Sequence, residues 1–74
     1  MFNFIFDETT GEYSLWWDSF EHKIGSLYEF IPGVWKCCPQ WQAHYQLGLP
    51  YREIRADTKE GAARVWLTEV EHGV

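Results

Sequence analysis

The fold is decided by residues 2–17, which read FNFIFDETTGEYSLWW. Large apolar residues alternate along both ends of this stretch, and a polar turn containing Gly11 separates the two runs. Two alternating runs joined by such a turn are typical of a β-hairpin. One face of the hairpin is expected to carry Phe2, Phe4, Phe6, Tyr13, Leu15 and Trp17. The opposite face then carries Ile5 and Trp16, and there we expect exposed apolar surface.

The next segment has the spacing of a helix. Asp18 precedes Glu21 by three residues, as in a capping box. The apolar positions that follow repeat at helical intervals, at Phe20, Ile24, Leu27, Tyr28 and Ile31. We therefore expect a helix over about residues 19–31, ended by a Pro-Gly pair at 32–33. Gly25 weakens that helix by up to about 1 kcal/mol, and the aromatic and β-branched content leaves a strand over 23–31 as the alternative.

Residues 34–56 predict a second hairpin. After a short extended piece at 34–39, residues 41–47 alternate between apolar and polar side chains, which is the pattern of a half-buried strand. A Gly-Leu-Pro turn at 48–50 leads into a more polar strand over 51–56. Its charges suit a position near the edge of a sheet, where they deter mispairing.

The strongest helical pattern covers residues 57–70. Asp57 is placed to cap the helix, and Glu60 completes a capping box. Glu60 also precedes Arg64 by four residues, the favourable order for an ion pair on a helix. The apolar stripe consists of Ala63, Trp66, Leu67 and Val70. Gly73 is expected to end the helix.

The element order is therefore ββαββα. Its simplest arrangement is a four-stranded antiparallel sheet with both helices on one face, which makes residues 1–74 a single small α+β domain. A second domain is excluded, because compact domains usually need about 50 residues or more each. The uncovered face of the sheet is left for water or for a partner.

Composition adds two unusual features. Aromatic residues make up 19% of the chain, which predicts either an aromatic core or an aromatic binding patch. The net charge is -5, and the acidic residues of the N-terminal third have no basic residue among them. The five that precede the first base, Lys23, are Asp7, Glu8, Glu12, Asp18 and Glu21.

The two cysteines and the first residues of the chain indicate in which cellular compartment the protein works. Cys37 and Cys38 are neighbours, so they cannot close a loop that constrains the unfolded chain. The first residues lack the basic start and long apolar run of a secretory leader. No stretch approaches the roughly 20 apolar residues that cross a bilayer. We expect a reducing cytoplasm and no membrane association.

No pattern in the sequence predicts catalysis, a metal or a cofactor. Cys37, Cys38, His22 and His44 are zinc-type ligands, but adjacent cysteines point to different sides of an extended chain, which favours two structural thiols. A nucleophile elbow and a Gly-rich phosphate loop are both missing from the sequence. We therefore expect a protein that is not an enzyme.

Single-stranded nucleic acid is one alternative partner. The aromatic and basic residues that would serve are Trp35, Lys36, Trp41, Tyr45, Tyr51, Arg52 and Arg55. A net charge of -5 disfavours attraction to phosphates, so direct nucleic-acid binding is not the preferred interpretation. A homodimer that uses the bare sheet face is the other alternative.

In size, acidity, single-domain organisation and lack of a catalytic signature, the chain resembles the small inhibitors that bacteriophages and mobile elements use against host defences, the anti-CRISPR proteins among them. The resemblance rests on the profile of the whole chain and on no motif. It implies action in the host cytoplasm, on a basic surface of a host complex.

These observations predict a non-enzymatic inhibitor or adaptor that binds a protein partner with a basic surface. The carboxylates would form the rim of the interface and the tryptophans its apolar anchors. The residues expected to bind the partner are Asp7, Glu8, Glu12, Trp16, Trp17, Asp18 and Glu21.

Overall fold

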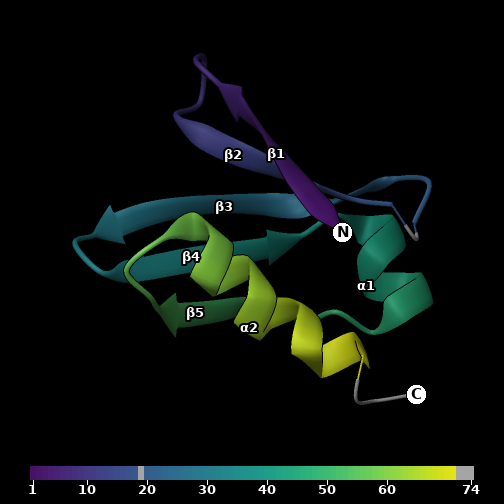
Figure 1. The fold of residues 1–74 in the computed structure, drawn as a ribbon. Helices are drawn as coiled ribbons and strands as arrows, with labels where there is room; N and C mark the ends of the chain where they lie inside the picture. Colours follow the sequence, from purple (N-terminus) through teal and green to yellow (C-terminus); the bar gives the residue numbers. More distant parts are fainter. Residues whose placement is uncertain (19, 72–74) are drawn as a thin grey trace.

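A computed structural model describes residues 1–18 and 20–71 of the chain, with the side chain of residue 71 not described. Five strands and two helices follow one another in these residues (Figure 1). Their bounds are β1 Phe2–Asp7, β2 Glu12–Trp17, β3 Lys23–Ile31, β4 Val34–Pro39, α1 Trp41–Leu47, β5 Arg52–Arg55 and α2 Lys59–Glu71. The expected α+β class is confirmed. The expected order ββαββα is wrong, because the order is ββββαβα and the sheet has five strands instead of four.

All neighbouring strands are antiparallel, and they lie in the order β1-β2-β3-β4-β5. The predicted first hairpin is confirmed, and its register, with Phe4 opposite Leu15 and Phe6 opposite Tyr13, puts the six residues expected on one face together. Gly11 closes the turn at a φ of 74°, a left-handed conformation that glycine adopts without steric strain. β1 and β5 are the two edges of the sheet, so the expected edge position of the polar strand is also confirmed.

The expected helix over 19–31 is wrong, since residues 23–31 form β3, the central strand; Ser19 itself lies outside the described residues. Gly25 gives the physical reason. A Cβ at this position would lie 2.8 Å from Cη2 of Trp66 and would overlap the carbonyl oxygen of Cys38. Gly25 therefore lets the neighbouring strand and the α2 indole approach the backbone of β3 closely, a common role for a glycine inside a strand.

The expected strand over 41–47 is also wrong, because these residues form the short helix α1. In a helix, Ala43 and Leu47 are neighbours four residues apart, and both turn inward, while Trp41 and Tyr45 point outward. Gly48 ends α1 with a φ of 71° and donates its N–H to the carbonyl of His44 at 3.1 Å. The alternation of apolar and polar residues was thus misleading.

The last helix was predicted correctly, and its apolar stripe is buried throughout. Thr58 caps it instead of Asp57: its Oγ1 accepts the N–H of Gly61 at 3.0 Å. Glu60 pairs with Lys59 at 3.0 Å and not with Arg64. The expected end at Gly73 lies outside the described residues.

One hydrophobic core lies between the sheet and the helices. α2 packs against β3, β4 and β5, and α1 packs against β3. Trp66 fills the centre of the core with no exposed surface, and its Nε1 donates to the carbonyl of Pro50 at 2.7 Å. The β1–β2 hairpin extends beyond the helices (Figure 1), and it reaches α2 through Lys59, whose Nζ lies 5.4 Å from the ring centre of Phe4 and 5.0 Å from that of Tyr13.

Neither helix in the described part of the chain is long and apolar enough to cross a bilayer.

Candidate functional site

The helices pack on one face of the sheet, and the other face, here called the open face, has no element packed on it among the described residues. The strand registers place its side chains in rows. One row runs through Ile5, Ser14, Ser26 and Cys38, and a second runs through Tyr28, Lys36 and Glu53. The first row has a small centre, because serine side chains occupy the two middle strands. A partner could therefore approach the backbone of the sheet closely there.

The hairpin carries the most apolar and most acidic part of this face. Ile5 is 58% exposed and Trp16 is 36% exposed, as the sequence predicted. Asp7 and Glu12 alternate with these residues on the same face, directly opposite each other in the ladder, and Glu8 follows in the turn. We call these five residues the acidic hairpin face. Among the described residues, none of its three carboxylates makes a salt bridge.

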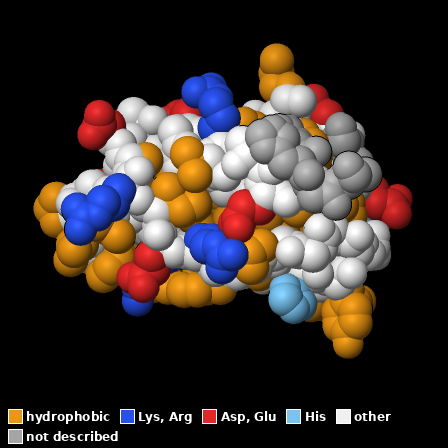
Figure 2. Space-filling view, turned by 90° about the horizontal axis from the view of Figure 1, so that it is seen from below, with side chains coloured by type: hydrophobic (Ala, Val, Ile, Leu, Met, Phe, Trp, Pro, Cys, Tyr) orange, Lys and Arg blue, Asp and Glu red, His pale blue; other side chains and the backbone are white. Residues whose placement is uncertain are grey.

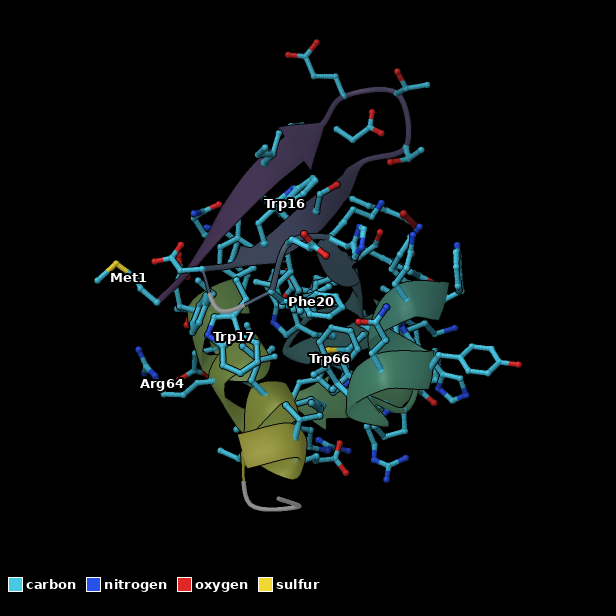
Figure 3. The ribbon with its side chains drawn as sticks, turned by 90° about the vertical axis from the view of Figure 1, so that its right-hand side faces the viewer. Met1, Trp16, Trp17, Phe20, Arg64 and Trp66 are labelled. Carbon is cyan, nitrogen blue, oxygen red and sulfur yellow. The ribbon has the colours of Figure 1, made fainter. Side chains whose placement is uncertain are left out.

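The structure does not gather all seven predicted binding residues. Trp17 lies on the covered face, opposite Phe2, where it is half-buried against the core. Figure 3 shows Trp17 on the helical side of the sheet and Trp16 on the other side of the same strand. Asp18 and Glu21 lie in the connection between β2 and β3, at the far end of the hairpin from its turn. Each has a local partner: Asp18 lies 3.9 Å from the terminal ammonium, and Glu21 lies 3.7 Å from Nε2 of His22.

The centre of the open face is electrostatically mixed. Burial is the main cause that raises the pKa of the Cys38 thiol; the Glu12 carboxylate raises it further and the Lys36 ammonium opposes this. Partial desolvation and the nearby Glu53 carboxylate raise the pKa of Tyr51 in the same region. The Lys36 ammonium lies 4.5 Å from the ring centre of Phe30, a cation-π arrangement. The negative end of the face is therefore the hairpin, and the face becomes mixed towards β4 and β5.

The residues of the nucleic-acid alternative are dispersed. Trp35 is buried in the core and donates its Nε1 to the carbonyl of Ala56 at 3.1 Å, so its ring is not a stacking platform. Arg52 is paired with Glu69 at 3.0 Å. Trp41 and Tyr45 are exposed on α1, while Lys36 lies on the open face. A single strand would have to cross two different surfaces to touch them all.

The thiols and histidines do not meet. Cys37 faces the core and Cys38 the open face, and both are free. Burial raises the pKa of Cys37 to about 12, and the Cys38 thiol adds to this. His44 lies on α1, with Nδ1 3.0 Å from the carbonyl oxygen of Leu49. No cluster of three or more metal-ligating side chains exists among residues 1–18 and 20–71.

The sequence suggested Trp41 and Tyr45 only as residues for nucleic-acid binding, and the expected strand over 41–47 hid the fact that they form an exposed aromatic pair. Trp41 is 64% exposed and Tyr45 82% exposed, and their rings meet edge to face at 6.4 Å on α1. Figure 2 shows that hydrophobic side chains also reach the surface in several separate places among charged ones on the face formed by β5 and the helices. The signal that could have found the pair is its spacing of four residues, which places both rings on one side of a helix.

Comparison with protein-family models, curated proteins and solved structures found no match to this chain.

Proposed function

We propose that this protein is a non-enzymatic inhibitor or adaptor that docks its acidic hairpin face on a basic surface of a protein partner. The observation that carries the proposal is the combination on one face of two exposed apolar side chains, Ile5 and Trp16, with carboxylates that have no salt-bridge partner among the described residues. Apolar anchors surrounded by charge are the usual composition of a protein interface.

The position of the carboxylates supports a basic partner. Asp7, Glu8 and Glu12 cluster at the turn, which projects away from the helices, so a partner can reach them without contacting the core (Figure 1). Surface carboxylates without a salt-bridge partner raise the rate of association with a positively charged surface and fix the orientation of the two proteins. They add less to the affinity. A basic nucleic-acid-binding surface of a host defence complex, as the resemblance to anti-CRISPR inhibitors implies, has this chemistry.

The proposal narrows the predicted set of binding residues. Trp17 packs against the hydrophobic core, and Asp18 and Glu21 lie at the other end of the hairpin from its turn. The interface is therefore expected to contain Ile5, Asp7, Glu8, Glu12 and Trp16.

A pair of matched charge-reversal variants tests the proposal. The first combines Asp7→Lys with Glu12→Lys on the acidic hairpin face, and the second combines Asp18→Lys with Glu21→Lys at the other end, so both change the net charge equally. A partner captured from a bacterial lysate would be identified by mass spectrometry, purified and titrated calorimetrically against both variants. We expect the first variant to lose at least about tenfold in affinity, equivalent to about 1.4 kcal/mol, and the second to lose much less.

Equal losses of affinity in the two variants would show that only net charge matters and would contradict the proposal.

A single-stranded DNA oligonucleotide titrated at low salt is the comparison for the alternative function. Tight binding of that oligonucleotide, weakened by Lys36→Ala and not by the hairpin variant, would favour the nucleic-acid alternative.

A further inference from the structure

The edge strand β1 presents unpaired backbone groups. β2 lies on one side of β1, and no strand within residues 1–18 and 20–71 lies on the other (Figure 1). The Met1 carbonyl accepts the N–H of Asp18 at 3.0 Å, and the Asp7 carbonyl accepts the N–H of Gly11 at 2.8 Å. At both ends of β1, the backbone groups of odd-numbered residues therefore point toward β2. Because inward and outward residues alternate in an antiparallel ladder, the N–H and C=O groups of Phe2, Phe4 and Phe6 point outward.

This edge lacks the features that usually prevent strand addition. From Phe2 to Phe6 the strand contains no charge, no proline and no glycine. The opposite edge is protected: β5 has four residues, and three of them, Arg52, Glu53 and Arg55, are charged. The contrast is a property of the sequence at each edge, and it singles out β1 as the strand that can accept another.

We propose that β1 pairs antiparallel with β1 of a second copy of this chain, about a two-fold axis at Phe4. This register places Phe4 opposite Phe4 and Phe2 opposite Phe6, so all six outward groups of each strand find a partner and a continuous ten-stranded sheet results. It also brings the half-exposed ring of Phe6 beside Phe2 of the other copy on the covered face. Cross-strand aromatic pairs of this kind stabilise antiparallel sheets.

The register is symmetric about Phe4, so a second copy of the same strand suits this edge, and the net charge of -5 does not oppose it. The paired residues 2–6 are uncharged in both copies, so no like charges face each other along the junction. The two Asp7 side chains fall three residues either side of the axis, about 20 Å apart. That separation is roughly twice the screening length at physiological salt, so their repulsion is small. The inference does not depend on the proposed function, because it uses the edge of the hairpin and not its open face.

The test is the mass of the protein in solution, measured by sedimentation equilibrium from about 1 μM to about 500 μM. One strand pair makes a small interface, so we expect a dimer with a dissociation constant on the order of micromolar. The double variant Asn3→Lys with Ile5→Lys should be monomeric over the whole range, since it places ammonium groups opposite one another across the junction. Both positions are exposed, so the fold should tolerate the change.

The control separates edge pairing from association through the open face. Ser26 lies in the middle of the open face and away from β1, so Ser26→Lys should still dimerise. Amide hydrogen exchange gives an independent readout: the N–H groups of Phe2, Phe4 and Phe6 should exchange at least about tenfold more slowly at the high concentration than at the low one. A monomeric wild type at about 500 μM, a monomeric Ser26→Lys variant, or exchange at these three amides that does not depend on concentration would each overturn the inference.

Discussion

The contact between Gly25 and the α2 indole makes a sharp prediction about stability. Replacing Gly25 with alanine adds one methyl group at a place where the nearest atoms belong to rigid parts of the structure. The new Cβ would lie 2.8 Å from Cη2 of Trp66 and 3.0 Å from Cα of Pro39, and it would overlap the Cys38 carbonyl oxygen. A normal carbon-carbon contact is about 3.5 Å, so the indole alone would have to retreat by about 0.7 Å.

That movement is opposed on all sides. The indole is fully buried and its Nε1 is bonded to the Pro50 carbonyl, while the Cys38 carbonyl belongs to β4, which is paired with strands on both edges. Overpacking of this type usually costs 1–3 kcal/mol, and the involvement of backbone places Gly25→Ala near about 3 kcal/mol. A domain of this length has roughly 3–5 kcal/mol of net stability, so the substitution should remove most of it.

Urea unfolding followed by tryptophan fluorescence measures the effect. With a slope of about 1 kcal/mol per M, the midpoint for Gly25→Ala should fall by about 2–3 M. The matched control is Gly61→Ala, which adds the same methyl group in α2, where the nearest side-chain atom, Oγ1 of Thr58, lies 3.3 Å away. It should change stability by less than about 1 kcal/mol, because the better helix propensity of alanine is offset by the tight contact with the capping hydroxyl. A Gly25→Ala midpoint within about 0.5 M of wild type would refute the packing argument.

Four further predictions concern the core, the cap and the thiols. Trp66→Phe should destabilise the fold by about 2–4 kcal/mol in the same urea assay, because it leaves a cavity and an unpaired carbonyl at Pro50. Thr58→Ala should cost about 1 kcal/mol through the lost cap of α2, whereas an unchanged midpoint would show that the hydroxyl does not hold the helix end. Limited alkylation with iodoacetamide at pH 8 should modify Cys38 well before Cys37 in the native protein and both equally in urea, as mass spectrometry of the peptides can show. The pKa of about 12 keeps Cys37 protonated in the fold, so stability should also fall as pH rises above the ordinary thiol value of 9.0.

The two ends of the chain were predictable because their patterns are long and locally consistent. The alternation of Phe2, Phe4 and Phe6 has no helical counterpart, and the stripe through Trp66 has no strand counterpart. The middle was not predictable from periodicity. The apolar residues of 23–31 fit both periods, and only the packing of α2 against Gly25 distinguishes them.

The candidate site was predicted in part for a similar reason. Register along one hairpin follows from its own sequence, so the exposure of Ile5 and Trp16 could be derived. The position of Asp18 and Glu21 depends on how β2 joins β3, and the expected helix concealed that connection. Exposure of Tyr45 depends on α1 being a helix, which no alternation rule indicates.

Because the hairpin extends beyond the helices, it also affects which part of the domain opens first. Its ladder to β3 is backed by little of the helical layer, and the bridge to α2 through Lys59 is one half-buried side chain. Local opening should therefore begin at β1 and β2 while β3 to β5 stay closed. A molecule that binds the hairpin only in its closed state would shift this local equilibrium and raise the melting temperature of the domain. A thermal-shift assay can therefore detect a ligand of this surface before its chemistry is known.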